Sequence, residues 1–226
     1  MKPNRAEILE RLTSQANPEN VAGMARFGIN PQGTLGVSIP TLRQMAKETG
    51  KDHHLAQALW DSGLHEARIL ASMVDDPSLV SEEQMENWVK DFDSWDICDQ
   101  VCSNLFDRTS YAYQKASEWS TREEIFVKRA GFTLMASLAM HDKKAQDEKF
   151  EQFFPTIARA STDERNFVRK AVNWALRGIG KRNRYLNGRA IQTAQEIQKI
   201  DSKTARWVAA DALRELTSEK IQHRLT

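Results

Sequence analysis

Hydrophobic residues recur along most of the chain at the spacing of an α-helix. At about 100° per residue, one helix face is formed by Ile97, Cys98, Val101, Cys102 and Leu105. A later face is formed by Phe167, Val168, Ala171, Ala175 and Ile179. No segment keeps up an alternation of apolar and polar residues, so the pattern predicts helices and no strands.

Local sequence signals divide this pattern into helix-length segments. The Gly- and Pro-containing stretch 28–40 predicts a long loop that opens into a helix at Thr41. Capping boxes that start helices are predicted at Ser81 with Gln84, Thr121 with Glu124, and Ser161 with Glu164. Helix ends are predicted at Gly50, at Gly63, at 75–77 and at 178–180.

The succession of amphipathic helices indicates the fold class. Segment 123–140 is apolar nearly all round, which is typical of a central helix buried on several sides. We expect an all-α protein, an α-solenoid of stacked antiparallel helix pairs of the HEAT or armadillo kind, with a concave basic groove. We expect residues 1–226 to form a single domain.

Composition excludes several classes of protein. With 40% hydrophobic and 28% charged residues, the chain is unlike collagen, mucins or disordered acidic tails. It has no apolar stretch long enough to span a bilayer, and the start MKPNRAEILE lacks the apolar core of a secretory signal. We therefore expect a cytoplasmic protein with no membrane partner. Cys98 and Cys102 are expected to be small core residues, and neither is expected to act as a nucleophile.

Charge is distributed unevenly although the formal net charge is only +1. Residues 60–107 contain twelve acidic and two basic side chains, whereas residues 165–189 contain eight basic side chains and no acid. This basic run has Lys170, Trp174, Arg177 and Lys181 at helical spacing. It indicates a surface for nucleic acid or another polyanion, and the alternative is a solvated helix face.

Two further segments could carry chemistry. In DSWDICD, Trp95 and Asp99 lie four residues apart at the margin of the apolar face, where an indole could hold a sugar and a carboxylate could stabilise positive charge. The alternative is a boundary Trp beside a solvated Asp. Lys128 and Arg129 lie inside the apolar segment 123–140, where they form a structural salt bridge or bind phosphate in a groove.

No sequence pattern indicates a cofactor. The histidines have no partners at metal-site spacing, and the chain has neither a Walker loop nor a dinucleotide-binding glycine motif. We expect no cofactor and no metal.

Four segments together resemble the AlkD-type family of DNA alkylation repair proteins, and the similarity spans most of the chain. The segments are LGVSIP (35–40) before Leu42 and Arg43, SWDICD (94–99), KRA (128–130) and FVRKAVNWALR (167–177). The resemblance implies a HEAT-like solenoid that binds duplex DNA and acts as a cofactor-free glycosylase. It also implies that the site residues are Trp95, Asp99, Arg129 and Trp174.

In that family the substrates are purines alkylated at N3 or N7, whose positive charge makes them good leaving groups. The resemblance implies that Asp99 stabilises the oxocarbenium-like sugar and orients water, without extrusion of the base. It further implies that Trp95 and Trp174 pack on the sugar and that Arg129 binds phosphate. The further DNA-binding residues are expected to be Lys128, Arg169, Lys170, Arg177, Lys181, Arg182 and Arg184.

Two other functions fit the same sequence features. The first is a non-catalytic protein that binds duplex or branched DNA through the same basic groove. The second is a protein-interaction scaffold, which would leave the basic run unexplained. We expect the protein to act as a monomer on double-stranded DNA that contains alkylated bases.

Overall fold

Every regular element in residues 3–225, the part of the chain that the structure describes, is a helix. The structure is a computed structural model. Its helices fall into two compact units, one up to Ser110 and the other from Tyr111 onward, which we call the N-terminal and C-terminal units. The prediction of an all-α protein is confirmed, and the single domain stays a prediction.

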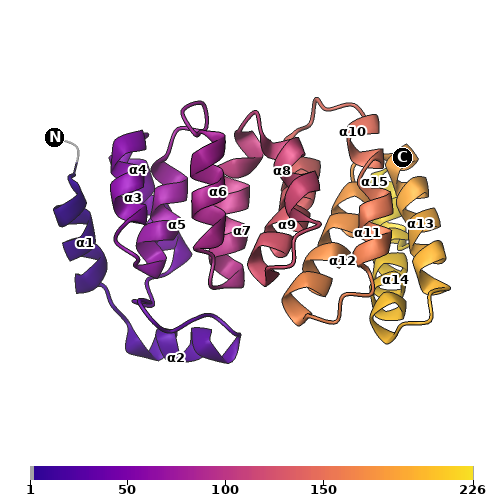
Figure 1. Cartoon of the computed structure of the whole chain (residues 1–226), viewed down its shortest axis with the longest axis horizontal. Helices are drawn as coiled ribbons and strands as arrows, with labels where there is room; N and C mark the ends of the chain where they lie inside the picture. Colours follow the sequence, from indigo (N-terminus) through magenta and orange to yellow (C-terminus); the bar gives the residue numbers. More distant parts are fainter. Residues whose placement is uncertain (1–2, 226) are drawn as a thin grey trace. The chain divides into compact units, whose positions relative to one another are not determined.

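The N-terminal unit is built around α5, which packs against α3, α4 and α7. Figure 1 shows α3 to α7 side by side, with α2 running crosswise below them. The helices of this unit are α1 (Arg5–Ser14), α2 (Pro18–Arg26), α3 (Ile39–Thr49), α4 (His53–Trp60), α5 (His65–Val74), α6 (Glu82–Lys90), α7 (Trp95–Asn104) and the short 3-10 helix η1 (Phe106–Arg108).

The C-terminal unit is built around α9, which packs against both α8 and α12. Most side chains of α9 are buried, which confirms the central helix predicted from its apolar sequence. The helices are α8 (Ala112–Trp119), α9 (Ile125–His141), α10 (Glu148–Glu151), α11 (Phe154–Ala160), α12 (Asn166–Gly180), α13 (Arg184–Gln198), α14 (Lys203–Leu216) and α15 (Glu219–Arg224).

Helix boundaries agree with the sequence signals in part. Ser81 accepts a hydrogen bond from the backbone N–H of Gln84 and starts α6, as predicted, but the Gln84 side chain donates to Asp75 and does not complete the capping box. The capping boxes predicted at Thr121 and Ser161 are absent, and these predictions are wrong. The two hydroxyls donate to carbonyl oxygens of the preceding helices instead. A Ser or Thr hydroxyl can hydrogen-bond to backbone groups at either end of a helix. These residue types therefore do not by themselves show whether a helix begins or ends there.

The predicted helix ends at Gly50 and at 75–77 are confirmed, because Gly50 and Asp75 cap the ends of α3 and α5. Other boundaries differ by about two residues. The first helix after the long loop begins at Ile39, with Ser38 as its cap, rather than at Thr41. Helix α12 continues through Gly178 and ends at Gly180. None of the helices in residues 3–225 is both long enough and apolar enough to cross a bilayer.

Candidate functional site

Trp95 and Asp99 lie one turn apart on α7, and both are half-buried. Because residues four apart share a helix face, the indole and the carboxylate flank each other. The indole Nε1 of Trp95 donates a hydrogen bond to the carbonyl oxygen of Phe27 at 3.0 Å. This bond engages the polar Nε1–H group of the indole and links α7 to the end of α2.

The first turn of α7 is held by polar contacts that the sequence did not reveal. Ser94 precedes the helix, and its hydroxyl accepts a hydrogen bond from the backbone N–H of Asn30 at 2.9 Å. The Asn30 side chain donates to Asp93 at 2.7 Å. These bonds tie the loop before α3 to the start of the helix that carries Trp95.

His65 on α5 also supports this turn. Its Nε2 lies 2.8 Å from the carboxylate of Asp96, and the imidazole is 3% exposed. Burial alone would lower the pKa of His65, but the hydrogen bond and the charge of Asp96, with the charges of Glu66 and Asp93, outweigh it and raise this pKa. Folding therefore shifts His65 toward its imidazolium form.

Glu66 anchors the motif segment 35–37 and was missed in the sequence. Its buried carboxylate accepts three hydrogen bonds, from the backbone N–H groups of Leu35 at 2.9 Å, Gly36 at 2.6 Å and Val37 at 3.2 Å. A buried carboxylate is tolerated when several donors satisfy it. No local signal marks Glu66, because these donors come from another part of the chain.

Arg129 and Lys128 on α9 have different surroundings. Arg129 is 6% exposed, and its guanidinium donates to the carbonyl oxygen of Phe167 at 2.6 Å. Lys128 forms an ion pair with Asp163 at 3.1 Å. Burial alone would raise the pKa of Asp163, but hydrogen bonds from Arg165 and Lys128 lower it to about 2. Of the two roles considered for these cations, Lys128 has the structural salt bridge.

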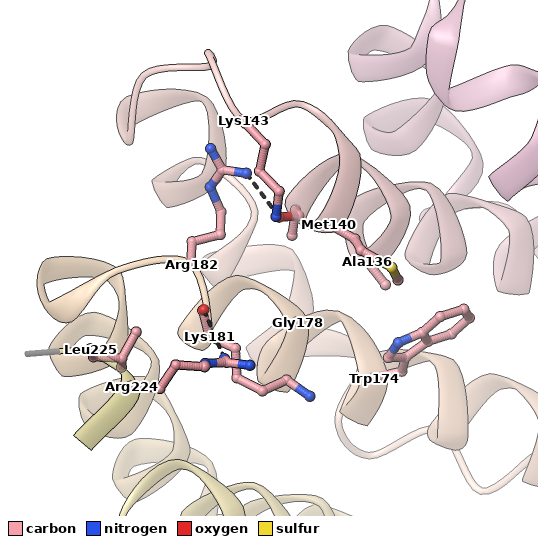
Figure 2. A pocket seen from close by; sticks show the side chains of 10 residues that line it. Ala136, Met140, Lys143, Trp174, Gly178, Lys181, Arg182, Arg224 and Leu225 are labelled. Atoms are coloured by element: carbon pink, nitrogen blue, oxygen red, sulfur yellow. Dashed lines mark hydrogen bonds between the residues drawn. The ribbon is translucent and has the colours of Figure 1, made fainter. Parts of the chain in front are cut away.

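Trp174 on α12 is half-buried and lines a pocket of about 520 Å³. Ala136 and Met140 of α9 form its apolar wall, and Gly178 contributes only backbone. Figure 2 shows Trp174 on one side of this pocket and cationic side chains on the other. Lys143 and Arg224 were not among the predicted site residues, although they line it.

Much of the basic run is neutralised by acids that lie elsewhere in the chain. Glu215 on α14 accepts from Arg177 at 2.6 Å and from Lys181 at 2.8 Å, and Asp211 lies 3.7 Å from Arg177. Burial would raise the pKa of Glu215, but Lys181 and Arg177 outweigh this and lower it. The absence of acids within residues 165–189 therefore does not make the whole run free positive charge.

The other predicted DNA-binding cations of the run either contact other parts of the protein or are exposed. Arg182 donates to the carbonyl oxygens of Ala139 at 2.8 Å and Ala145 at 3.2 Å. The guanidinium of Arg169 lies 5.1 Å from the centre of the Trp207 ring. Lys170 and Arg184 are exposed, and neither forms an ion pair within the described residues. These two side chains are the most accessible charges of the predicted set.

The structure divides the predicted catalytic residues between the two units. Trp95 and Asp99 share α7 in the N-terminal unit, whereas Arg129 and Trp174 lie on α9 and α12, which pack together in the C-terminal unit.

The chain has the HEAT-like helical repeat fold that the helix pattern predicts. It is similar, at a TM-score of 0.82 and 17% identity over 99% of this chain and 96% of the other, to a solved structure described as a new family of proteins related to the HEAT-like repeat DNA glycosylases with affinity for branched DNA structures. Lower similarity is found to an engineered protein (TM-score 0.40, 13% identity, 80% and 86% covered). A designed armadillo repeat protein in complex with a peptide is at a comparable level (TM-score 0.38, 14% identity, 82% and 87% covered).

The family model described as DNA alkylation repair enzyme matches residues 8–216. This match covers most of the chain, and the chain belongs to that family. No curated protein matches it.

Proposed function

We propose that the protein is a DNA N-glycosylase that hydrolyses the bond between deoxyribose and a purine alkylated at N3 or N7, in duplex DNA. The observation that carries this proposal is the half-buried carboxylate of Asp99 beside the indole of Trp95, in a chain of the DNA alkylation repair family. A carboxylate in such a setting can stabilise positive charge that develops on a sugar.

The reaction requires few catalytic groups. A purine alkylated at N3 or N7 is cationic, so its departure neutralises charge and needs no general acid. Asp99 stabilises the oxocarbenium-like sugar and orients the attacking water, while the base stays in the stack. Trp95 and Trp174 pack against the sugar, and Arg129 binds a backbone phosphate.

The basic side chains bind the DNA backbone in this proposal. Lys170 and Arg184 are exposed and can reach phosphates without breaking an ion pair. The other cations of the predicted set contribute positive potential and direct contacts where the local pairs allow it. They are Lys128, Arg169, Arg177, Lys181 and Arg182.

The first experiment compares wild type with Asp99→Asn on duplex DNA that has been treated with a methylating agent. We expect wild type to release 7-methylguanine or 3-methyladenine, measured by chromatography, and Asp99→Asn to release it at least about 100-fold more slowly. Binding to the same DNA should be unchanged. Equal rates of base release by the two proteins would contradict the role of Asp99.

A matched control removes a carboxylate elsewhere in the N-terminal unit. Asp61 is exposed at the C-terminal end of α4, so Asp61→Asn changes the net charge by the same amount away from α7. We expect Asp61→Asn to release base at the wild-type rate.

A second candidate function is non-catalytic binding of branched DNA. It is favoured by the similarity to a structure whose description names affinity for branched DNA. In this case neither wild type nor Asp99→Asn would release base, and both would retard a branched DNA in a gel. Steep loss of affinity with salt would distinguish either DNA-binding function from an apolar peptide scaffold.

A further inference from the structure

The pocket beside Trp174 lies entirely in the C-terminal unit. One side of it is aromatic and the other side is cationic. Ala136, Ala139 and Met140 near the end of α9 form an apolar wall, and Gly178 contributes backbone beside it. Trp174 stands on one side, and Lys143, Arg182 and Arg224 stand on the other (Figure 2). The volume of about 520 Å³ is in the range of about 300 to 1,000 Å³ that is typical of pockets for small organic ligands.

The charged side of the pocket has no carboxylate in its lining. Lys143 is exposed and makes no ion pair within the described residues. Arg224 is exposed and donates one hydrogen bond to the carbonyl oxygen of Lys181 at 3.1 Å. The guanidinium of Arg224 and the ammonium of Lys143 therefore remain available to an anion.

The aromatic side of the pocket is suited to a planar group. Trp174 is half-buried, and its indole makes no hydrogen bond within the described residues. Stacking on an aromatic side chain tolerates any base, because every base has a π-face. A planar ring and an anion at opposite sides of one pocket match the two ends of a nucleotide.

We propose that this pocket binds an unpaired nucleotide, with its phosphate on Lys143 and Arg224 and its base against Trp174. Inside a duplex, both faces of a base are covered by its neighbours, so an unpaired nucleotide offers Trp174 a face that an internal base pair does not. The proposal rests on the DNA-binding part of the proposed function, and it gives Trp174 a second contact, with an unpaired base, besides the sugar that this indole packs against in base excision.

The test uses the full chain and two DNA hairpins that differ only in a short unpaired 5′ overhang. The pocket variant is K143Q/R224Q, and the control variant is K144Q/K220Q. The control removes the same charge from exposed lysines close in sequence that do not line the pocket. All four side chains are exposed, so both variants are expected to fold, which circular dichroism checks.

We expect wild type and the control to bind the overhang hairpin about tenfold more tightly than the blunt hairpin, by fluorescence anisotropy. The pocket variant should lose this preference and bind the blunt hairpin as the control does. Equal affinity of wild type for both hairpins, or an unchanged preference in K143Q/R224Q, would overturn the proposal.

Competition identifies the source of the nucleotide. Displacement of the overhang hairpin by free dAMP, but not by inorganic phosphate, would support a site that also accepts a free nucleotide. Displacement by neither would support a nucleotide held within a strand, provided that the preference for the overhang is present. Equal displacement by both would overturn the role of Trp174 in contacting the base.

Base release from a blunt methylated duplex separates this proposal from the proposed function. Loss of base release in Asp99→Asn concerns only the glycosylase, whereas loss of the overhang preference in K143Q/R224Q concerns only the pocket. Either result can be obtained without the other.

Discussion

Gly131 allows α8 and α9 to approach closely in the C-terminal unit. A Cβ atom at this position would lie 2.3 Å from the backbone nitrogen of Ser120 and 2.7 Å from its Cα. Backbone atoms cannot move aside as a flexible side chain can, so the two helices would have to separate. The identity of this residue is therefore set by packing, although Gly lowers helix propensity.

We predict that Gly131→Ala destabilises the protein by about 1–3 kcal/mol, because overpacking forces backbone shifts. The free energy of unfolding from urea titration measures this change. Gly23→Ala in α2 is the matched control, since no heavy atom lies within 4 Å of a Cβ there. The control should be neutral or stabilising by up to about 1 kcal/mol. Equal stability of Gly131→Ala and wild type would contradict the close approach.

Individual site residues could be predicted where they depend on local spacing. Trp95 and Asp99 share a helix face because they are four residues apart, and the sequence alone establishes that relation. The supporting residues Glu66 and His65 could not be predicted, because their partners come from other elements. Their sequence neighbourhood carries no pattern that separates them from ordinary polar residues.

At the scale of elements, α5 and α7 are joined by the contact between His65 and Asp96. The pKa of His65 is raised in the folded protein, so folding favours its protonated form. A raised pKa contributes stability that is fully present below the unfolded value of about 6.5. This contribution is lost as the pH rises through the folded pKa.

We predict that, as the pH rises above about 6.5, the unfolded pKa of histidine, the wild-type free energy of unfolding falls more steeply than that of His65→Gln. Glutamine keeps a hydrogen-bond donor toward Asp96 but does not titrate. Urea unfolding at several pH values measures both profiles, and their difference removes the contribution of other groups. Parallel profiles would show that His65 does not carry this pH dependence.

Helix order and type could be predicted better than helix starts. The central position of α9 follows from an apolar sequence on all its faces, and the structure confirms it. The predicted starts at Thr121 and Ser161 were wrong because those hydroxyls bond to the preceding helix ends. Capping depends on which backbone groups lie near a hydroxyl, and the same residue types suit both ends.

At the scale of the whole molecule, folding pairs part of the basic run with acids from another helix. The basic run has no acid in its own sequence, but α14 supplies Asp211 and Glu215 to Arg177 and Lys181. Lys170 and Arg184 stay exposed. The accessible positive charge for a polyanion is therefore smaller than the sequence count of cations indicates.

We predict that Lys170→Gln and Arg184→Gln each reduce the slope of log affinity against log salt for duplex DNA by about one. Each change removes one accessible cation and the counterion that it displaces. Lys199→Gln, an exposed cation outside the run, is the control and should leave the slope unchanged. Fluorescence anisotropy at several salt concentrations measures the slopes. An unaltered slope in both variants would place the DNA elsewhere on the protein.

The sequence by itself determined the all-α class, the buried central helix and the shared face of Trp95 and Asp99. These properties follow from spacing within a single helix, where about 3.6 residues make a turn. The tertiary structure alone decided which cations are neutralised, which carboxylate holds segment 35–37, and that Lys143 and Arg224 line the pocket of Trp174. Each of these joins residues from separate elements, and only the packing of helices brings their side chains together.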